Sequence, residues 1–322
     1  MKNLVSVIIP CYNAENYVSE AIENALHQSY DPIEVIVVDD GSTDGSLDVI
    51  KSFSEQVTWR TGENQGVSAA RNRGIEIAEG EFVKFLDADD MLPEHAVETQ
   101  VSQIREINRE RASVFGDSLQ IGPEGIVIGH SSFRQMRDEE DPISYILKVN
   151  PGVSYPLHRR KYLEEIGGFD EGLPWAEDYD LHLRLHLAGI LMQYRTANVV
   201  RVRQHEDDNR LTNRKTKEFE ETPWAPYKRA RDREQKIREA CEGSLSDAVS
   251  QHLAKGFWSS GRQAIKSGHT HIAKKYFDHA RELHSQPIAS PSRLYHMAVR
   301  MLGPTNTEHL VQWVRRVQQR LP

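Results

Sequence analysis

The sequence predicts an α/β fold, in which a mostly parallel sheet carries helices on both faces and an α-helical C-terminal region follows. Three observations support this prediction. Short β-branched runs alternate with amphipathic helical stripes from residue 4 to about residue 104. Acidic residues stand where two of those runs end. After about residue 215 the glycine and β-branched content falls, and residues that favour helices dominate.

The first two strands are the β-branched runs at residues 5–9 and 33–38. Because both runs are almost continuously apolar, we expect them to be buried in a parallel sheet. Between them, apolar residues recur at three- and four-residue spacing over residues 18–26, and Asn13 is available as an N-cap. This spacing predicts an amphipathic helix that crosses from one strand to the next.

The same alternation continues along the chain. The predicted elements are helix 47–53, strand 57–60, helix 67–77, strand 82–86, helix 96–104 after a first-turn proline at Pro93, and strand 113–116. A glycine-rich hairpin is expected around residues 123–125. Ligands of such sheets bind at the carboxyl ends of the strands, so functional side chains are expected there.

Two domains are expected, residues 1–214 and residues 215–322. Residues 215–322 hold 19 basic and 11 acidic residues, a formal charge of +8. Residues 1–214 hold 21 basic and 37 acidic residues, a formal charge of −16, and the two parts sum to the −8 of the whole chain. The acidic first domain argues against nucleic acid as a partner. In the second domain, apolar residues between positions 254 and 283 resemble those of a tetratricopeptide-like helix pair.

An apolar stripe near the end of the chain runs beside several arginines. It consists of Leu310, Trp313, Val314 and Val317, next to Arg315, Arg316 and Arg320. Such a helix either lies on an anionic membrane or packs inside the protein. The sequence has no run of 18 apolar residues, and Cys11 and Cys241 belong to no metal-binding pair. We therefore expect a cytoplasmic protein with free thiols, and we hypothesise peripheral contact with the inner face of the membrane.

Three carboxylates follow the strand at residues 82–86. They are Asp87, Asp89 and Asp90. Like charges so close together repel each other unless a cation neutralises them, and hard carboxylate oxygens suit Mg²⁺ or Mn²⁺. The segment therefore predicts a site for a divalent metal and a diphosphate. A calcium-binding loop is excluded, because Met91 and Leu92 stand where a ligand and a glycine are required.

Other phosphate-binding classes are weakened by spacing. The chain has no GxxxxGK[ST] loop, and its first strand is followed by PCYN at residues 10–13 in place of GxGxxG. Kinases and dehydrogenases are therefore excluded. An aspartyl-phosphate phosphatase would carry its Asp-x-Asp pair after the first strand, with Thr or Val where Met91 stands, so that class is disfavoured.

Six motifs occur in the order that is typical of one enzyme family. They are VSVIIPCYN at residues 5–13, VVDDGSTDG at 37–45, NQGVSAARNRG at 64–74, FLDADD at 85–90, GGFDE at 167–171 and AEDYD at 176–180. On these motifs, residues 4–205 resemble the family 2 glycosyltransferases, which have the GT-A fold. The resemblance implies transfer of a sugar from a nucleotide donor, expected to be a UDP-sugar. The acceptor would be a glycan, a lipid-linked molecule or a protein.

The resemblance assigns Asp39 to the uracil edge of the nucleotide, with Pro10 and Tyr12 lining the base pocket and Arg71 nearby. A carboxylate accepts a hydrogen bond from an imide N–H, and an aromatic ring offers a stacking face. Asp39 and Asp40 also precede a glycine, so they are turn residues in their own right. The structural alternative for Arg71 is a solvated residue on the surface of its helix.

By the same resemblance, Asp87 faces the ribose or the metal, and Asp89 coordinates the divalent cation, Mn²⁺ or Mg²⁺, that bridges the diphosphate. Asp90 is expected to cap the following helix. His205 stands where relatives carry an Arg-x-His motif, and its imidazole would be a further ligand suited to Mn²⁺. Because the cation meets the charge of the leaving group, one general base is expected to suffice.

The family places its base in a Glu-Asp pair, which in this chain is Glu177 and Asp178. Asp178 is expected to take the proton from the acceptor hydroxyl, and direct displacement then inverts the anomeric centre. Acidic residues also favour helix N-termini because of the helix dipole. Glu177 and Asp180 therefore have a purely structural alternative.

Two other functions are weighed against sugar transfer. A sugar-1-phosphate nucleotidyltransferase shares the half-Rossmann plan, but it would carry a glycine-rich loop with a basic residue, which residues 10–16 lack. A non-catalytic scaffold, whose helical tail binds a partner, is disfavoured by the intact Asp87, Asp89 and Asp178. Donor hydrolysis by the purified protein would separate an enzyme from a scaffold.

Overall fold

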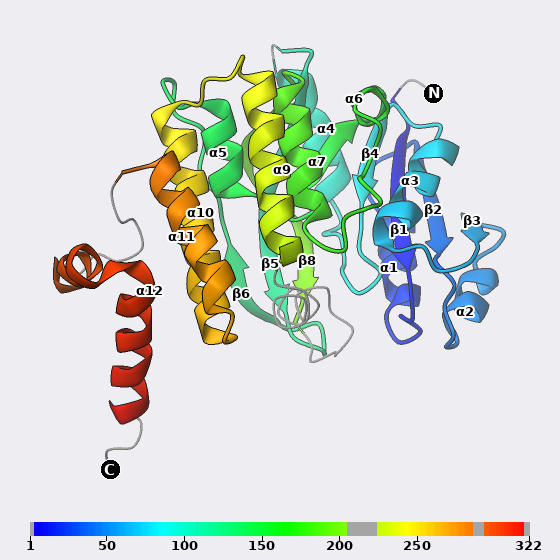
Figure 1. The fold of residues 1–322 in the computed structure, drawn as a ribbon. Coiled ribbons are helices and arrows are strands. Elements are labelled where there is room, and N and C mark those ends of the chain that lie inside the picture. The colour runs from blue at the N-terminus through cyan, green and yellow to red at the C-terminus, as the bar shows by residue number, and fades with distance from the viewer. Residues whose placement is uncertain (1–2, 108, 205–223, 286–292, 319–322) are drawn as a thin grey trace. The chain divides into compact units, whose positions relative to one another are not determined.

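The computed structural model describes residues 3–107, 109–204, 224–285 and 293–318 of the 322-residue chain (Figure 1). The chain forms two compact units, residues 1–207 and residues 208–322. The domain boundary predicted at residue 214 lies outside the described residues. None of the helices in those described ranges is long and apolar enough to cross a lipid bilayer.

The first unit alternates strands and helices from its beginning, as predicted. Its first elements are β1 (Val5–Cys11), α1 (Val18–Leu26), β2 (Ile33–Asp39), α2 (Ser46–Ser52), β3 (Thr58–Thr61), α3 (Val67–Ile77), β4 (Phe82–Phe85) and α4 (Ala96–Glu106). They are followed by β5 (Ala112–Ile121), β6 (Val127–Ser131), α5 (Pro142–Val149), β7 (Pro156–Arg159), α6 (Arg160–Glu165), α7 (Glu177–Leu187) and β8 (Leu191–Arg203). The predicted helix at residues 67–77 matches α3 at both ends.

The strands form one sheet with a parallel part and a mixed part. Within the described residues the sheet has eight strands in the order β3-β2-β1-β4-β7-β5-β6, and β8 pairs with β5. The strands β3, β2, β1 and β4 are parallel to one another, whereas β7 pairs antiparallel with β4 and β5, and β6 pairs antiparallel with β5. β8 runs parallel to β5. The expected hairpin at residues 123–125 joins β5 to β6.

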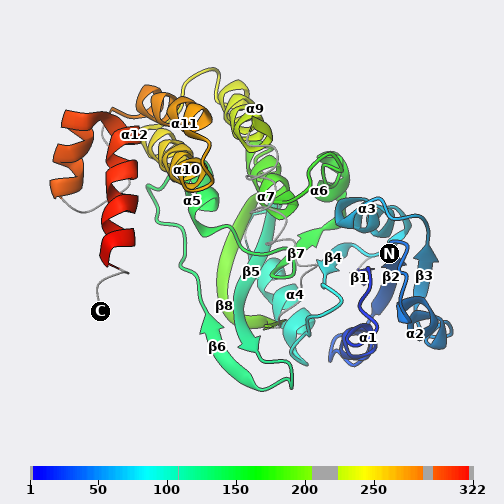
Figure 2. The same cartoon turned by 60° about the horizontal axis from the view of Figure 1, so that its bottom comes forward.

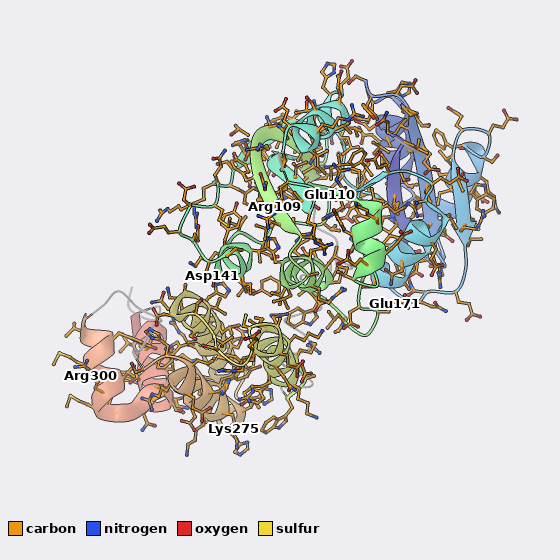
Figure 3. The ribbon with its side chains drawn as sticks, turned by 90° about the horizontal axis from the view of Figure 1, so that it is seen from above. Arg109, Glu110, Asp141, Glu171, Lys275 and Arg300 are labelled. Carbon is orange, nitrogen blue, oxygen red and sulfur yellow. The ribbon has the colours of Figure 1, made fainter. Side chains whose placement is uncertain are left out.

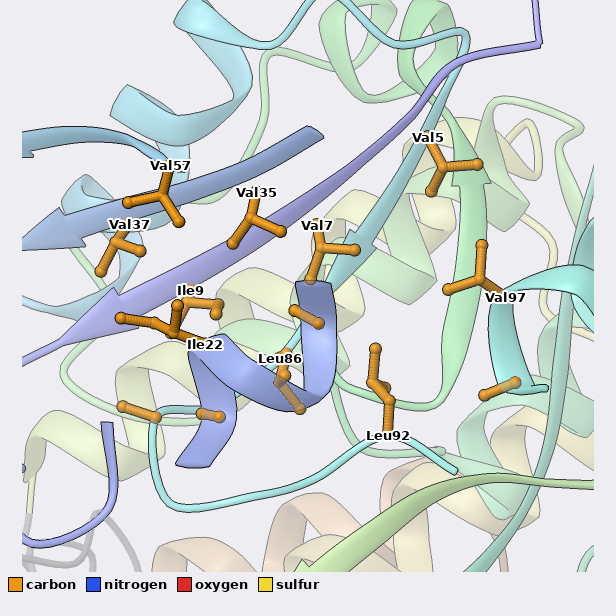
Figure 4. Packing of buried hydrophobic residues seen from close by; sticks show 14 of the residues in the cluster. Val5, Val7, Ile9, Ile22, Val35, Val37, Val57, Leu86, Leu92 and Val97 are labelled. Carbon is orange, nitrogen blue, oxygen red and sulfur yellow. The ribbon is translucent and has the colours of Figure 1, made fainter. Parts of the chain in front are cut away.

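Helices cover both faces of the sheet, as the sequence predicts (Figure 2). On one face, α1, α2 and α4 contribute Ile22, Ile50 and Val97 to one core cluster. On the other face, α3, α5, α6 and α7 contribute to a second cluster. Alternate residues of β1 divide between the two, since Ile9 lies in the first cluster (Figure 4) and Ile8 in the second. Burying each such side chain stabilises the fold by roughly 1.5–3 kcal/mol.

Three local predictions are wrong. Asn13 does not cap α1, because the N-cap is Tyr17 and the side chain of Asn13 bonds to the loop after β2. Pro93 lies before the first turn of α4, whose N-cap is His95. β5 continues to Ile121, beyond its predicted end, because its second half pairs with both β6 and β8.

The second unit contains helices and no strand in its described residues. They are α9 (Trp224–Ala240), α10 (Asp247–Lys266), α11 (Thr270–Leu283) and α12 (Arg293–Gln318). The predicted helix pair corresponds to α10 and α11, which bury Trp258 and Phe277 in one cluster. Gly303 interrupts α12 with φ 77° and ψ 162°, a conformation that glycine adopts at little cost. α12 therefore consists of two helical segments.

Candidate functional site

The residues singled out by the sequence lie where neighbouring parallel strands end. In β1, Cys11 pairs with Asp39 of β2, and Ile8 pairs with Phe85 of β4. Because these strands are parallel and in register, their carboxyl ends meet at one edge of the sheet. Tyr12, Asp39 and the acidic segment after β4 are therefore brought to the same edge.

Asp39 is held in the turn after β2. It is 1% exposed, and its Oδ1 accepts a hydrogen bond from the backbone N–H of Ser42 at 3.2 Å, while its Oδ2 accepts one from the Thr61 hydroxyl at 2.7 Å. Both oxygens of this buried carboxylate therefore have partners inside the protein. Pro10 is also buried, whereas Tyr12 is 41% exposed and offers an open ring face.

The loop after β1 is bonded to the loop after β2. The Ser42 hydroxyl accepts from the backbone N–H of Asn13 at 3.0 Å, and the side-chain oxygen of Asn13 accepts from the backbone N–H of Thr43 at 2.8 Å. A third bond joins the carboxylate of Glu15 to the backbone N–H of Gly45 at 2.7 Å. These bonds fix the loop that carries the exposed tyrosine. Sequence reasoning missed them because their partners lie about 30 positions apart.

Asp40 orders the loop that precedes α3. It is 2% exposed, and its two oxygens accept from the backbone N–H groups of Gln65 at 3.0 Å and Gly66 at 2.7 Å. The guanidinium of Arg73 lies 3.4 Å from Asp40 Oδ1. Asp40 therefore ties the end of β2 to the loop before α3, and Arg73 is its ion-pair partner.

Arg71 joins two parts of the site that are far apart in the sequence. It is 2% exposed, and its Nη1 lies 2.9 Å from Glu177 Oε1 while its Nη2 lies 2.8 Å from Asp87 Oδ1. Its guanidinium also lies over the ring of Phe169, 5.3 Å from the centroid. Burial alone would lower the pKa of Arg71, but the two carboxylates raise it. The nucleotide-binding role of Arg71 stays a prediction. In this structure both terminal nitrogens bind carboxylates, so Arg71 ties Asp87 to Glu177.

Three acidic residues lie in the first turn of α7, and two of them have structural partners. They are Glu177, Asp178 and Asp180. Glu177 is 6% exposed and bound to Arg71, and Asp180 accepts a hydrogen bond from Arg184 Nε at 2.6 Å. The catalytic role of Glu177 stays a prediction, and in this structure its carboxylate lies in a buried ion pair with Arg71. Asp178 remains as the candidate base.

Asp178 is mostly shielded from solvent, and its environment disfavours the charged form. Burial and, next in size, the negative charge of Glu177 raise the pKa of Asp178 from its ordinary value of 3.8 to about 6, although the Tyr179 N–H and Arg71 act to lower it. Its Oδ1 accepts from the backbone N–H of Tyr179 at 2.6 Å. A carboxylate with a pKa near neutrality is a more effective proton acceptor than an ordinary aspartate. Ala176, the N-cap of α7 two residues before Asp178, has φ 62°, a strained conformation for alanine.

The three carboxylates after β4 differ in their exposure to solvent. Asp87 has 36% of its side chain exposed and Asp89 is partly exposed, so solvent reaches both side chains. Asp90 is 6% exposed and accepts from the backbone N–H of Arg203 at 3.0 Å. The prediction that Asp90 caps the following helix is wrong, because that helix begins after His95. Asp90 instead fixes the turn to the end of β8.

Arg203 reinforces the same connection. Its Nε donates to the backbone oxygen of Asp89 at 3.1 Å, its Nη1 donates to the backbone oxygen of Pro123, and its Nη2 forms an ion pair with Glu20 of α1. The side chain is 2% exposed. Arg203 therefore supports the acidic turn from inside the fold. His205, the predicted further metal ligand two residues on, lies outside the described residues.

Asn72 is a residue of the site region that sequence reasoning missed. Its side-chain oxygen accepts from the backbone N–H of Phe169 at 2.8 Å, and its side-chain nitrogen donates to the backbone oxygen of Phe169 at 3.0 Å. The same nitrogen donates to Glu171 at 2.8 Å. Gly168 has φ 67°, and a Cβ there would collide with the Asn72 amide. Asn72 thus holds the GGFDE motif against α3. In the sequence, the only sign of this contact was that Asn72 and Phe169 both belong to motifs of the same family.

Comparison with known sequences identifies one family. A family model for glycosyl transferase family 2 matches residues 6–167. A glycosyltransferase of Rickettsia felis is 35% identical over 195 residues, which cover 56% of this chain and 31% of that protein. The glycosyltransferase GlyG of Streptococcus pneumoniae is 42% identical over 110 residues, which cover 33% of this chain and 36% of that protein. The chain therefore spans about a third of the length of these relatives.

Solved structures share the fold. The structure of S. aureus TarS 1–349 has a TM-score of 0.68 at 21% identity, covering 98% of this chain and 92% of that chain. The mannosyltransferase PcManGT of Pyrobaculum calidifontis has a TM-score of 0.51 at 19% identity, covering 95% of this chain and 86% of that chain. The predicted α/β fold of GT-A type is confirmed. Because the family model matches half of its length, the chain belongs to glycosyl transferase family 2.

Proposed function

We propose that the protein is an inverting glycosyltransferase that moves a sugar from a UDP-sugar to a hydroxyl group of a glycan, a lipid-linked molecule or a protein. The observation that carries this proposal is the buried ion network of Arg71. It binds Asp87, at the edge where the donor diphosphate is expected, and Glu177, the neighbour of Asp178. One guanidinium thus ties the donor side of the site to the candidate base.

The donor class is supported by the solved neighbours and by the first two loops. TarS was crystallised with UDP-GlcNAc and with UDP, and PcManGT with GDP-Man and Mn²⁺. In this chain we assign the nucleotide base to the pocket of Pro10, Tyr12 and Asp39. Uracil would stack on the exposed ring of Tyr12 and donate its imide N–H to Asp39.

The carboxylates of Asp89 and Asp87 fit a divalent cation, Mn²⁺ or Mg²⁺, because they are hard oxygen donors that are open in part to solvent. In the part of the chain that the structure describes, no cluster of three or more His, Cys, Asp or Glu side chains could hold a metal alone. The remaining ligands would be donor phosphates, water and the predicted His205. When bound, the cation would offset the negative charge of the nucleoside diphosphate leaving group.

Asp178 is the proposed general base. It would take the proton of the acceptor hydroxyl while the hydroxyl oxygen bonds to the anomeric carbon and the bond from that carbon to the diphosphate breaks on the opposite face. This displacement inverts the anomeric centre. Glu177 and Arg71 would act indirectly, by holding the first turn of α7 against the donor edge.

Sugar transfer should follow the ionisation of Asp178. The base accepts a proton only when it is deprotonated, and burial raises its pKa to about 6. We therefore expect kcat/KM to fall about tenfold for each pH unit below that value and to level off above it. UDP release measured at saturating metal across this range gives the profile. A profile that stays flat through pH 6 would contradict the assignment.

Binding of UDP should depend on a divalent cation. Calorimetric titration of UDP in the presence of Mn²⁺ should give an affinity at least about tenfold higher than in the presence of EDTA, since the cation would bind the carboxylates and the diphosphate oxygens together. Asp89→Asn should lose this difference, whereas Asp48→Asn, on the surface of α2, should keep it. Absence of UDP binding under both conditions would overturn the proposed donor.

A further inference from the structure

The first segment of α12 exposes apolar side chains on one face while it buries others on a second face. Tyr295 and Val299 pack into the core of the second unit. Leu294, Met297 and Met301, which recur at three- and four-residue spacing, are 78%, 58% and 79% exposed. This spacing places the three side chains in one row along the helix, away from the core.

The second segment exposes further large apolar side chains. Leu310, Trp313 and Val314 recur at the same spacing and are 43%, 63% and 39% exposed. Together with Leu302, which is 45% exposed, these residues and the row on the first segment form what we name the α12 apolar surface. So many large exposed apolar side chains within about 20 residues mark an interaction site. The side chains of Arg315, Arg316, Val317 and Arg320, which belong to the predicted stripe, lie outside the described residues.

Exposed basic residues lie on α12 itself and on α11, which packs against it. Arg300 is exposed beside the row of the first segment, and Lys275 is exposed on α11 (Figure 3). Leu302 lines a pocket of about 370 Å³ that also contains Lys274 and Arg281, with Asp278 as its acidic member. Residues 270–322 hold eight basic and three acidic residues in total. The part of the chain that carries the apolar surface is therefore basic in sequence.

We propose that the α12 apolar surface binds the anionic surface of a phospholipid bilayer. Its leucines and methionines would enter the boundary between headgroups and acyl chains, Trp313 would anchor at that boundary, and the exposed cations of α11 and α12 would contact lipid phosphates. One anionic bilayer satisfies both the apolar row and the cations. A symmetric contact between two copies of the chain would bring the same basic residues together, which is unfavourable. This inference goes beyond the proposed sugar transfer and is independent of it.

The proposal is tested by flotation of the full chain with two kinds of vesicle, phosphatidylcholine alone and an equimolar mixture with phosphatidylglycerol. We expect binding to the anionic vesicles that is at least about tenfold stronger and is weakened by salt. The double variant Met297→Gln, Met301→Gln and the triple variant Lys274→Gln, Arg281→Gln, Arg300→Gln should each lower this binding at least about tenfold. All five side chains are exposed, so the variants should keep the circular dichroism of the native protein.

The matched control replaces exposed apolar residues elsewhere. Ile126, which precedes β6, is 69% exposed, and Ile128 in β6 is 61% exposed. The double variant Ile126→Gln, Ile128→Gln should leave vesicle binding unchanged. Three results would overturn the proposal. They are absence of binding to the anionic vesicles, equal loss in the variants and the control, and self-association that the methionine variant abolishes in a protein that binds no vesicle.

Discussion

Asp178→Asn should bind UDP with native affinity and lose sugar transfer. The amide has almost the same shape as the carboxylate but cannot accept the acceptor proton, so we expect kcat/KM to fall by about 10²–10⁴, the usual contribution of a general base. The measurement combines UDP release over a panel of UDP-sugars with calorimetric titration of UDP. Unchanged turnover would remove Asp178 from the mechanism.

Two controls make this result specific. Asp48→Asn makes the same chemical change at an exposed position of α2 and should leave both readouts unchanged. Asp178→Asn should also be at least as stable as the native protein at neutral pH. Because folding raises the pKa of Asp178, its ionised form is destabilised in the folded state above about pH 6, and the amide removes that charge. A lower melting temperature at neutral pH would indicate that Asp178 has a structural role instead.

Arg71→Met should strongly destabilise the first unit. The variant leaves the buried carboxylate of Glu177 without its cation and frees Asp87, and breaking a buried ion pair in this way costs about 3–5 kcal/mol. For a unit of this size, such a loss lowers the melting temperature by roughly 10 °C. Sugar transfer should fall as well, because the donor edge and the first turn of α7 lose their common support. Thermal unfolding monitored by circular dichroism measures the effect.

A second substitution separates charge from packing. Arg71→Met combined with Glu177→Gln removes the unpaired buried charge, so it should recover a large part of the lost melting temperature. Arg60→Met, at an exposed arginine of β3, is the matched control and should have little effect. If Arg71→Met melts no earlier than this control, the ion network does not support the fold.

The architecture of the first unit was largely predictable because its signals are local. Buried parallel strands appear as β-branched runs, and the crossover helices show the periodicity of an apolar face, so α3 was predicted to the residue. The second part of the sheet was less accessible. β5 is set by pairings with β6, β7 and β8, and a strand whose length depends on distant partners carries no local marker of its end.

The site shows the same division. The acidic segment and the Glu-Asp pair were found from short motifs, but the partner of each charge was not. Asp90 was expected to bond to the next helix and bonds to the end of β8 instead, 113 positions away. Arg71 was expected to face a ligand, yet it lies inside the fold against a carboxylate 106 positions away. Which of several nearby charges meets a ligand depends on burial, and burial is a property of the assembled fold.

The clamp between Asn72 and the GGFDE motif has a consequence for engineering. The amide of Asn72 occupies the space that any side chain at position 168 would need, and the backbone of that residue is already left-handed. The two motifs therefore form a single exchangeable module, although 97 positions separate their bonded residues. A chimera that imports the second motif from another transferase should be built with the matching stretch of α3. Directed libraries gain from varying both segments together.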